Sequence, residues 1–277
     1  MSRPAVTAQD LVVAYGETIA LDRSTFTIPA GKVTAVIGPN GSGKSTLLNV
    51  IAGLVHASSG SIEVPARSNG SRGIAYVMQT TKVNEALPVS VREVVTMGRY
   101  AGLGPYRPLG AEDREAVQVV MARTGISDLA SKHLGELSGG QRQRVFVAQG
   151  LAQEHDLLLL DEPLTGIDMT TAIAIDRILH EEVAEGCTVI LTTHDLSEAN
   201  VADHVLLLSG RVVASGPPDE VLTPAHLSEA YGAALLHIGD GDRIFLDDAA
   251  HDPVDMRHVH RERSIHTESS LEDTHGD

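Results

Sequence analysis

The chain has 277 residues, of which 42% are hydrophobic and 21% are charged. This composition is close to ordinary globular usage, so it excludes collagen, a coiled coil and wholesale disorder. The formal net charge is −16, and such a field repels nucleic acid and anionic lipid, so no nucleic-acid partner is predicted. The single cysteine, Cys187, excludes an intrachain disulfide and a multi-cysteine zinc site, and it fits a reducing compartment.

The first residues, MSRPAVTAQDLVVAYGE, contain no long apolar run behind Arg3. A secretory signal is therefore not expected there. Apolar runs elsewhere, such as residues 157–160, have the length of a core strand, far below the ~20 residues that span a bilayer. We expect a soluble, cytosolic protein that meets a membrane only through a partner.

Strand and helix patterns alternate along the first part of the chain, which predicts an α/β domain with a largely parallel sheet. Residues 33–38 form a buried-strand run that enters a glycine-rich turn, and 45–54 then have helical spacing up to Gly53. Further strands are predicted at 11–15, 24–28, 61–64 and 73–79.

The residue pattern changes between residue 80 and about residue 150, where it predicts an inserted helical region. Helices are expected at 91–103 and 112–125, joined by a loop at 102–110 that is rich in glycine and proline. In the second helix Ala116, Val117, Val120 and Met121 share one face.

Buried strands return at 156–163 and 187–195, and 204–216 is predicted to be a hairpin around Ser209-Gly210. The segment up to about Tyr231 is predicted to be helical. Residues 239–277 contain 11 acidic and 4 basic side chains and five of the 13 histidines, with few large apolar residues. We predict one domain over 6–238 and a mobile acidic tail over 239–277.

Residues 38–45 read GPNGSGKS, a match to the phosphate-binding pattern G-x-x-x-x-G-K-[ST] between a buried strand and a helix. Glycines let the backbone curl until several N–H groups point at phosphate oxygens, and the following helix adds the positive end of its dipole. Lys44 then reaches the β- and γ-phosphates, and Ser45 offers a hydroxyl to Mg²⁺.

Two carboxylates, Asp161 and Glu162, end the apolar strand DLLLLDEP. Asp161 can hold Mg²⁺ through water, and Glu162 can polarise an attacking water as a general base. The alternative is a strand that simply ends in an acidic loop. Gln79 and His194 also follow predicted strands; each, taken alone, is most simply an ordinary polar residue at a strand end.

Residues 137–141 read LSGGQ at the start of a predicted helix. Beside a phosphate loop this pentapeptide is very unlikely by chance. With it the chain resembles the nucleotide-binding subunit of ABC transporters over roughly 6–230. In the family's order it has a Walker A motif (38–45), a Q-loop Gln79, the signature (137–141), a Walker B motif (157–162), a D-loop Asp168 and an H-loop His194.

The resemblance implies a P-loop NTPase (RecA-like) core with an ABC antiparallel β-subdomain and an α-helical subdomain inserted at about 80–150. It implies a Mg²⁺-dependent ATPase in which two subunits pair head to tail around ATP. By resemblance, Ser138 and Gly140 contact the γ-phosphate of the opposite site, and His194 steadies that phosphate and the water. Gln79 contacts Mg²⁺, which Ser45 and Asp161 also hold, and Tyr15 stacks on adenine unless it is only a strand-face tyrosine. The nucleotide-binding set is Tyr15, Gly38, Pro39, Asn40, Gly41, Ser42, Gly43, Lys44, Ser45, Thr46, Ser138, Gly139, Gly140 and Gln141.

The D-loop reads LTGID (164–168) where many members read Ser-Ala-Leu-Asp, but Asp168 is kept. TGID, the segment 91–104 and the segment 216–232 look like the manganese/zinc importer subclass. That resemblance implies a partner permease, a second copy of the ATPase, a periplasmic or lipoprotein metal-binding protein, and a place at the cytoplasmic face of the cell membrane. The alternatives are an iron-siderophore, haem or cobalamin importer, a soluble non-transport ABC ATPase, and a non-catalytic regulatory subunit.

The tail's histidines permit a second reading of residues 239–277. His258, His260 and His266 could bind Zn²⁺ or Mn²⁺ loosely with help from the carboxylates. A solvated acidic tail without a ligand is the simpler alternative.

Overall fold

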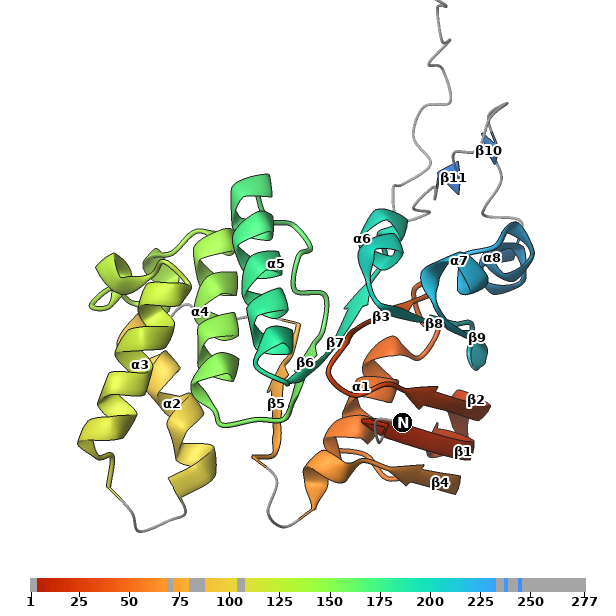
Figure 1. The fold of residues 1–277 in the computed structure, drawn as a ribbon, viewed down its shortest axis with the longest axis horizontal. Helices are drawn as coiled ribbons and strands as arrows, with labels where there is room; N and C mark the ends of the chain where they lie inside the picture. The colour runs from red at the N-terminus through yellow and green to blue at the C-terminus, as the bar shows by residue number, and fades with distance from the viewer. Residues whose placement is uncertain are drawn as a thin grey trace, which may run out of the picture.

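The computed structural model describes residues 4–68, 72–79, 88–103 and 108–232, and the backbone at 237–238 and 244–245. Within these residues the chain builds a central sheet, a smaller antiparallel sheet toward one end and a group of helices toward the other (Figure 1). No helix in these ranges is long and apolar enough to cross a membrane. The two sheets and the helices around them confirm the predicted α/β organisation.

The central sheet has the order β5-β6-β7-β3-β8-β9. All neighbours are parallel except the hairpin of the last two strands. Because parallel strands share a direction, their carboxyl ends meet at one edge, which is where ligands bind in such sheets. The strands are β3 (Val33–Ile37), β5 (Ile74–Val77), β6 (Leu157–Leu160), β7 (Thr188–Thr193), β8 (His204–Leu208) and β9 (Val212–Gly216).

Alternate side chains of the central strands enter two different cores, as strand geometry requires. In β6, Leu157 and Leu159 face the core that contains α1 and the antiparallel sheet. Leu158 and Leu160 face the core that contains the helical group and α5. Burial of both faces explains why this strand reads as an unbroken apolar run.

The second sheet has the order β2-β1-β4 and is antiparallel. Its inward side chains pack with Leu47, Leu48 and Ile51 of helix α1. Both early strands begin well before the predicted segments, because outward polar residues interrupt the apolar pattern. The elements are β1 (Val6–Tyr15), β2 (Thr18–Ile28), β4 (Ser59–Glu63), α1 (Lys44–Ala52) and the short turn η1 (Pro65–Arg67).

The predicted helical region is present at the far end of the central sheet (Figure 1). Val117, Val120 and Met121 are buried on one face of α3, as expected. A Cβ on Gly98 of α2 would lie 2.2 Å from the carbonyl oxygen of Gln149 in α4, so the two helices touch there. The elements are α2 (Val91–Leu103), α3 (Ala111–Arg123), η2 (Ser127–Leu129), η3 (Leu134–Glu136) and α4 (Gly139–Ala152).

Two further helices lie where no helix is predicted: α5 (Met169–Ala184) and α6 (Leu196–Val201). The Asp168 carboxylate caps α5 by accepting from the Thr171 N–H at 3.0 Å. The segment before Tyr231 contains two helices instead of one, α7 (Pro218–Val221) and α8 (Pro224–Tyr231). Pro224 has no N–H to continue a helix but suits a first position.

Most of the predicted tail, and residues 104–107 of the predicted loop, lie outside the described residues. Inside the tail the backbone of β11 (Ile244–Phe245) pairs antiparallel with β10 (His237–Ile238). The tail's predicted mobility and its three metal-binding histidines stay predictions.

Candidate active site

The glycine loop leaves β3 and enters α1 at the carboxyl edge of the central sheet. Gly41 and Gly43 have φ values of 78° and 99°, a region that favours glycine. A Cβ on Gly38 would lie 2.2 Å from the Leu208 carbonyl oxygen, and one on Gly43 would lie 2.7 Å from that of Ala20. A side chain would therefore be strained at Gly41 and Gly43, and there is no space for one at Gly38 and Gly43.

The start of α1 suits an anion. Gly43 is its N-cap and provides no side-chain cap, and the first turn contains no acidic residue. The N–H groups and the positive dipole end of the helix are thus left for a ligand. The Ser42 hydroxyl is buried without a hydrogen-bond partner in the described part of the chain. These features fit the phosphates of a nucleotide.

Lys44 lies over the loop that it follows. Its Nζ donates to the carbonyl oxygens of Gly38 at 2.7 Å and Pro39 at 3.1 Å. Burial lowers the pKa of Lys44, while the charges of Glu162 and Asp161 act in the opposite direction. A phosphate in the loop would compete with the two carbonyls for this ammonium group.

A threonine of the neighbouring strand β7 holds both acidic residues that follow β6, Asp161 by its carboxylate and Glu162 by its backbone N–H. Thr192 Oγ1 donates to Asp161 Oδ1 at 2.6 Å and accepts from the Glu162 N–H at 2.8 Å. Glu162 has a φ of 50°, which is uncommon for a residue with a side chain and costs of order 1–3 kcal/mol. The hydrogen bond that the Glu162 N–H donates to Thr192 helps to hold that conformation.

Gln79 reaches the same point from the end of β5. Its Nε2 donates to Glu162 Oε2 at 2.7 Å. The structure thus brings Gln79 and Glu162 into contact. Lys44 lies near enough to Asp161 and Glu162 for their charges to raise its pKa against the effect of burial. Ser45 is exposed at the start of α1. Carboxylate, amide and hydroxyl oxygens are a donor set that Mg²⁺ accepts.

The LSGGQ segment belongs to a second location. Ser138 is the N-cap of α4 and accepts from the Gln141 N–H at 3.3 Å. The segment adjoins the start of α5, because a Cβ on Gly140 would lie 3.3 Å from Asp168 Oδ2. A cavity of about 350 Å³ opens there, lined by Ser138, Gln141, Arg144, Asp168, Thr170, Thr171 and Ala174.

The remaining predicted residues border these two locations. His194 is exposed directly after β7, and Tyr15 is 49% exposed at the end of β1. Asn40 is exposed and Thr46 is half-buried in the loop and the first turn of α1. No described contact joins His194 or Tyr15 to the carboxylate pair, and their predicted roles stay predictions.

The predicted set omits Thr192 and Thr171. Thr192 links the Asp161 carboxylate to the Glu162 backbone N–H, and Thr171 donates to Asp168 Oδ2 at 2.8 Å. A small polar residue in the apolar strand TVILTT is the sequence signal for the first. The second is a threonine three residues beyond an aspartate N-cap, a pattern that indicates capping.

A glycine loop between a parallel strand and a helix, with a carboxylate pair on a neighbouring strand, defines a P-loop nucleoside triphosphatase. A model of the ABC transporter family matches residues 21–165. The chain belongs to this family, and it is an ATP-binding and ATP-hydrolysing subunit.

Relatives match over most of their lengths. "Chelated iron transport system membrane protein YfeB" of Yersinia pestis is 40% identical, and the match covers 89% of this chain and 85% of the relative. "Manganese transport system ATP-binding protein MntA" of Synechocystis sp. is 37% identical, with 84% and 92% covered. "Manganese transport system ATP-binding protein MntB" of Bacillus subtilis is 37% identical, with 85% and 95% covered.

Solved structures agree with the fold. A nucleotide-free ATP-binding cassette from an ABC transporter matches with a TM-score of 0.71 at 27% identity, covering 83% of this chain and 99% of that one. An ATP-binding cassette in its ADP conformation matches with a TM-score of 0.69 at 27% identity and the same coverage. The predicted ABC ATPase fold is confirmed.

We expect Thr192→Val to lower the ATPase rate about tenfold or more while ATP still binds. The hydroxyl is buried and joins both carboxylate residues. Valine has the same shape but leaves those groups unpaired, at a cost of about 1–3 kcal/mol. Thr192→Ser keeps the hydroxyl and should retain activity. Steady-state hydrolysis, ATP affinity and Tm of the variants check this. Wild-type turnover by a folded Thr192→Val protein would contradict it.

Proposed function

We propose that this ATPase subunit powers the import of a divalent transition metal, manganese or zinc, through a partner membrane permease. The observation that carries the catalytic part is the assembly of Lys44, Gln79, Asp161 and Glu162 at one edge of the sheet. The assignment of manganese or zinc as the transported substrate is supported by the relatives named for manganese transport. The relative named for chelated iron transport keeps an iron-complex importer as the second candidate.

In this proposal ATP lies on the glycine loop with its phosphates at the start of α1. Lys44 exchanges the Gly38 and Pro39 carbonyls for the β- and γ-phosphate oxygens. Ser45, Asp161 and Gln79 would hold Mg²⁺, which when bound neutralises charge on the phosphates. Tyr15, exposed at the end of β1, stacks on adenine. The remaining nucleotide contacts come from Gly38, Pro39, Asn40, Gly41, Ser42, Gly43 and Thr46.

Glu162 is the proposed general base. Its backbone is held by Thr192, and its Oε2 accepts from Gln79, so the carboxylate has a fixed place at the mouth of the loop. It takes a proton from the attacking water. His194, exposed at the end of β7, is proposed to steady the γ-phosphate and the water.

The LSGGQ segment is proposed to serve a second copy of the chain. Ser138 and Gln141 line the cavity beside Asp168, and Gly139 and Gly140 lie between them at the start of α4. The N–H groups at this helix start suit an anion. In a head-to-tail pair they face the partner's ATP. The assembly at the cytoplasmic face of the membrane is completed by the permease and by a periplasmic or lipoprotein metal-binding protein.

The test is the metal content of cells. We expect deletion of the gene to lower cellular manganese or zinc selectively in metal-depleted medium. Wild type should restore the metal, and Glu162→Gln should not, because transport depends on hydrolysis. A fall in iron alone would overturn the manganese or zinc assignment in favour of the iron-complex importer. A rise in metal would contradict import.

A further inference from the structure

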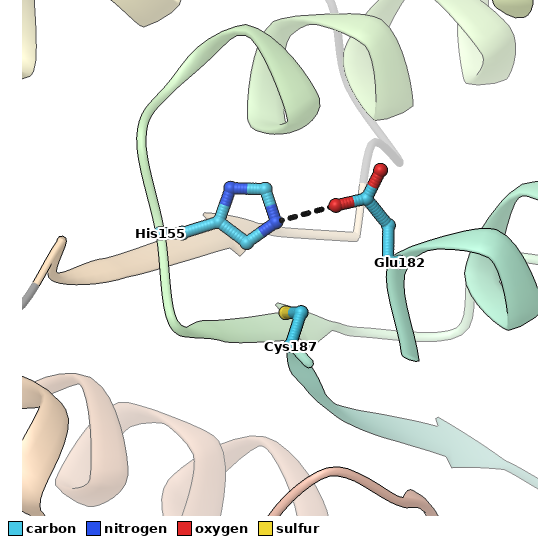
Figure 2. Close-up of side chains that lie close together, drawn as sticks. All are labelled: His155, Glu182 and Cys187. Atoms are coloured by element: carbon cyan, nitrogen blue, oxygen red, sulfur yellow. Dashed lines mark ion pairs between the residues drawn. The ribbon is translucent and has the colours of Figure 1, made fainter. Parts of the chain in front are cut away.

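Three side chains far from the nucleotide site converge in the interior. His155, Glu182 and Cys187 are all buried, and one ligand atom of each lies within 4.8 Å of the others (Figure 2). His155 comes just before β6 and Cys187 just before β7, while Glu182 lies in the last turns of α5. The cluster therefore sits at the amino-terminal edge of the central sheet, opposite the carboxyl edge that carries Asp161 and Glu162.

The histidine has the orientation of a metal ligand. His155 Nδ1 lies 2.7 Å from the Gln153 carbonyl oxygen, which only accepts, so Nδ1 carries a proton. Nε2 points into the cluster, 3.2 Å from Glu182 Oε2 (Figure 2). This contact is an ion pair without the alignment of a hydrogen bond, and the His155 side chain is 5% exposed. Ligating histidines are fixed in this way by a backbone carbonyl on the other nitrogen.

The other two groups are also held in place. Arg123 binds Glu182 Oε1 at 2.8 Å and leaves Oε2 directed at the imidazole. The Cys187 thiol donates to the Thr188 carbonyl oxygen at 3.3 Å, a weak bond that a thiolate would give up. Second contacts on ligands are typical of metal sites, because they set the orientation of each ligand.

We propose that His155, Glu182 and Cys187 form a binding site for a zinc-class transition-metal ion. Imidazole nitrogen, thiolate sulfur and carboxylate oxygen are the ligand types of tetrahedral Zn²⁺, and a thiolate disfavours Mg²⁺ and Ca²⁺. Neighbouring ligands of such an ion lie roughly 3.3–3.8 Å apart, given its bond lengths. The Nε2 to Oε2 distance of 3.2 Å lies just below this range, and the sulfur, within 4.8 Å of both atoms, would turn from the Thr188 carbonyl toward them. Water completes the fourth position.

The ligands stand at the far ends of the elements that carry the catalytic groups. β6 joins His155 to Asp161, β7 joins Cys187 to Thr192 and His194, and α5 joins Glu182 to Asp168. A bound ion would tie the amino ends of both strands to the end of α5. This site is independent of the proposed metal transport, since metal binding there needs neither the permease nor ATP hydrolysis. Its test therefore does not depend on the outcome of the transport assay.

The test uses cobalt(II) as a spectroscopic substitute for zinc. The chain has one cysteine, so thiolate-to-cobalt absorption in the near ultraviolet reports Cys187 and is not affected by any metal that histidines elsewhere in the chain hold. Metal displaces protons from Nε2 and from the thiol, so the titration is run on the reduced full chain at pH 8. We expect a saturable thiolate band at one cobalt per chain, which added Zn²⁺ removes.

Matched variants separate this site from unspecific binding. Cys187→Ala should abolish the band, and His155→Ala should weaken cobalt binding at the band at least about tenfold, the size of loss known for metal-site contacts. His180→Ala should leave it unchanged, because His180 is exposed on the same helix as Glu182 and pairs with Asp176 at 3.7 Å. Absence of the band in the wild type, or an unchanged band in His155→Ala, would overturn the proposal. The trio would then be an ion-pair cluster that fastens α5 to α3 through Arg123.

A second measurement tests the site in the wild type, so that it does not depend on whether the His155 variant folds. Alkylation of Cys187 in the wild type should slow at least about tenfold when Zn²⁺ is added, because a metal-bound thiolate is shielded, and Tm should rise with Zn²⁺. In Cys187→Ala the Tm should lose its Zn²⁺ dependence. Unchanged alkylation in saturating Zn²⁺ would contradict the site, whatever the fate of the variants.

Discussion

Glu162→Gln should bind ATP normally and hydrolyse it at least about a hundredfold more slowly than the wild type, the lower limit for loss of a general base. The amide oxygen of glutamine can still accept from Gln79, and the backbone bond to Thr192 is untouched. The fold and the nucleotide site should therefore survive, and only the proton acceptor is lost. Phosphate release and ATP affinity are the measurements.

Glu185→Gln is the matched control for this variant. Glu185 is an exposed carboxylate at the end of α5, remote from the carboxyl edge of the sheet, so its neutralisation should leave hydrolysis unchanged. If two copies pair around ATP, the Glu162→Gln protein with ATP should also elute as a dimer in gel filtration. Substantial hydrolysis by Glu162→Gln would show that another group takes the proton.

Lys44→Ala should lower the hydrolysis rate about 10²–10³-fold, the loss seen when one group that stabilises transition-state charge is removed. The glycine loop surrounds the Lys44 ammonium group, which donates to the carbonyl oxygens of Gly38 and Pro39. Without it the phosphates lose a charge-assisted contact. ATP affinity should fall as well, and both quantities are measured with fluorescent nucleotide and a phosphate assay.

Lys32→Ala removes the same charge at the other end of β3. Lys32 is exposed and pairs with Asp203 at 3.1 Å, and such surface pairs contribute about 0–1 kcal/mol. We expect this control to bind and hydrolyse ATP as the wild type does. Equal losses in both variants would indicate a general effect of charge and would remove Lys44 from its assigned role.

Much of the site can be predicted from the local sequence, because the residues that form it lie next to one another in the chain. The glycine loop, Lys44 and the start of α1 are contiguous, so spacing alone predicts an anion site between a strand and a helix. The parallel strands can also be predicted from the sequence, since burial on both faces makes each strand continuously apolar. Helix α5 is not predicted, although Ile175, Ile178 and Leu179 fall on its buried face. Its start depends on the Asp168 cap.

Contacts between strands were decided only by the tertiary structure. Gln79 meets Glu162, and Thr192 bridges Asp161 and Glu162, because β5, β6 and β7 lie side by side in register. His155 and Cys187 meet for the same reason at the opposite edge, where the end of α5 adds Glu182. Sequence by itself determined which residue types follow each strand and hence the chemistry available. Register and helix packing, which depend on contacts between distant segments, determined which of those residues touch.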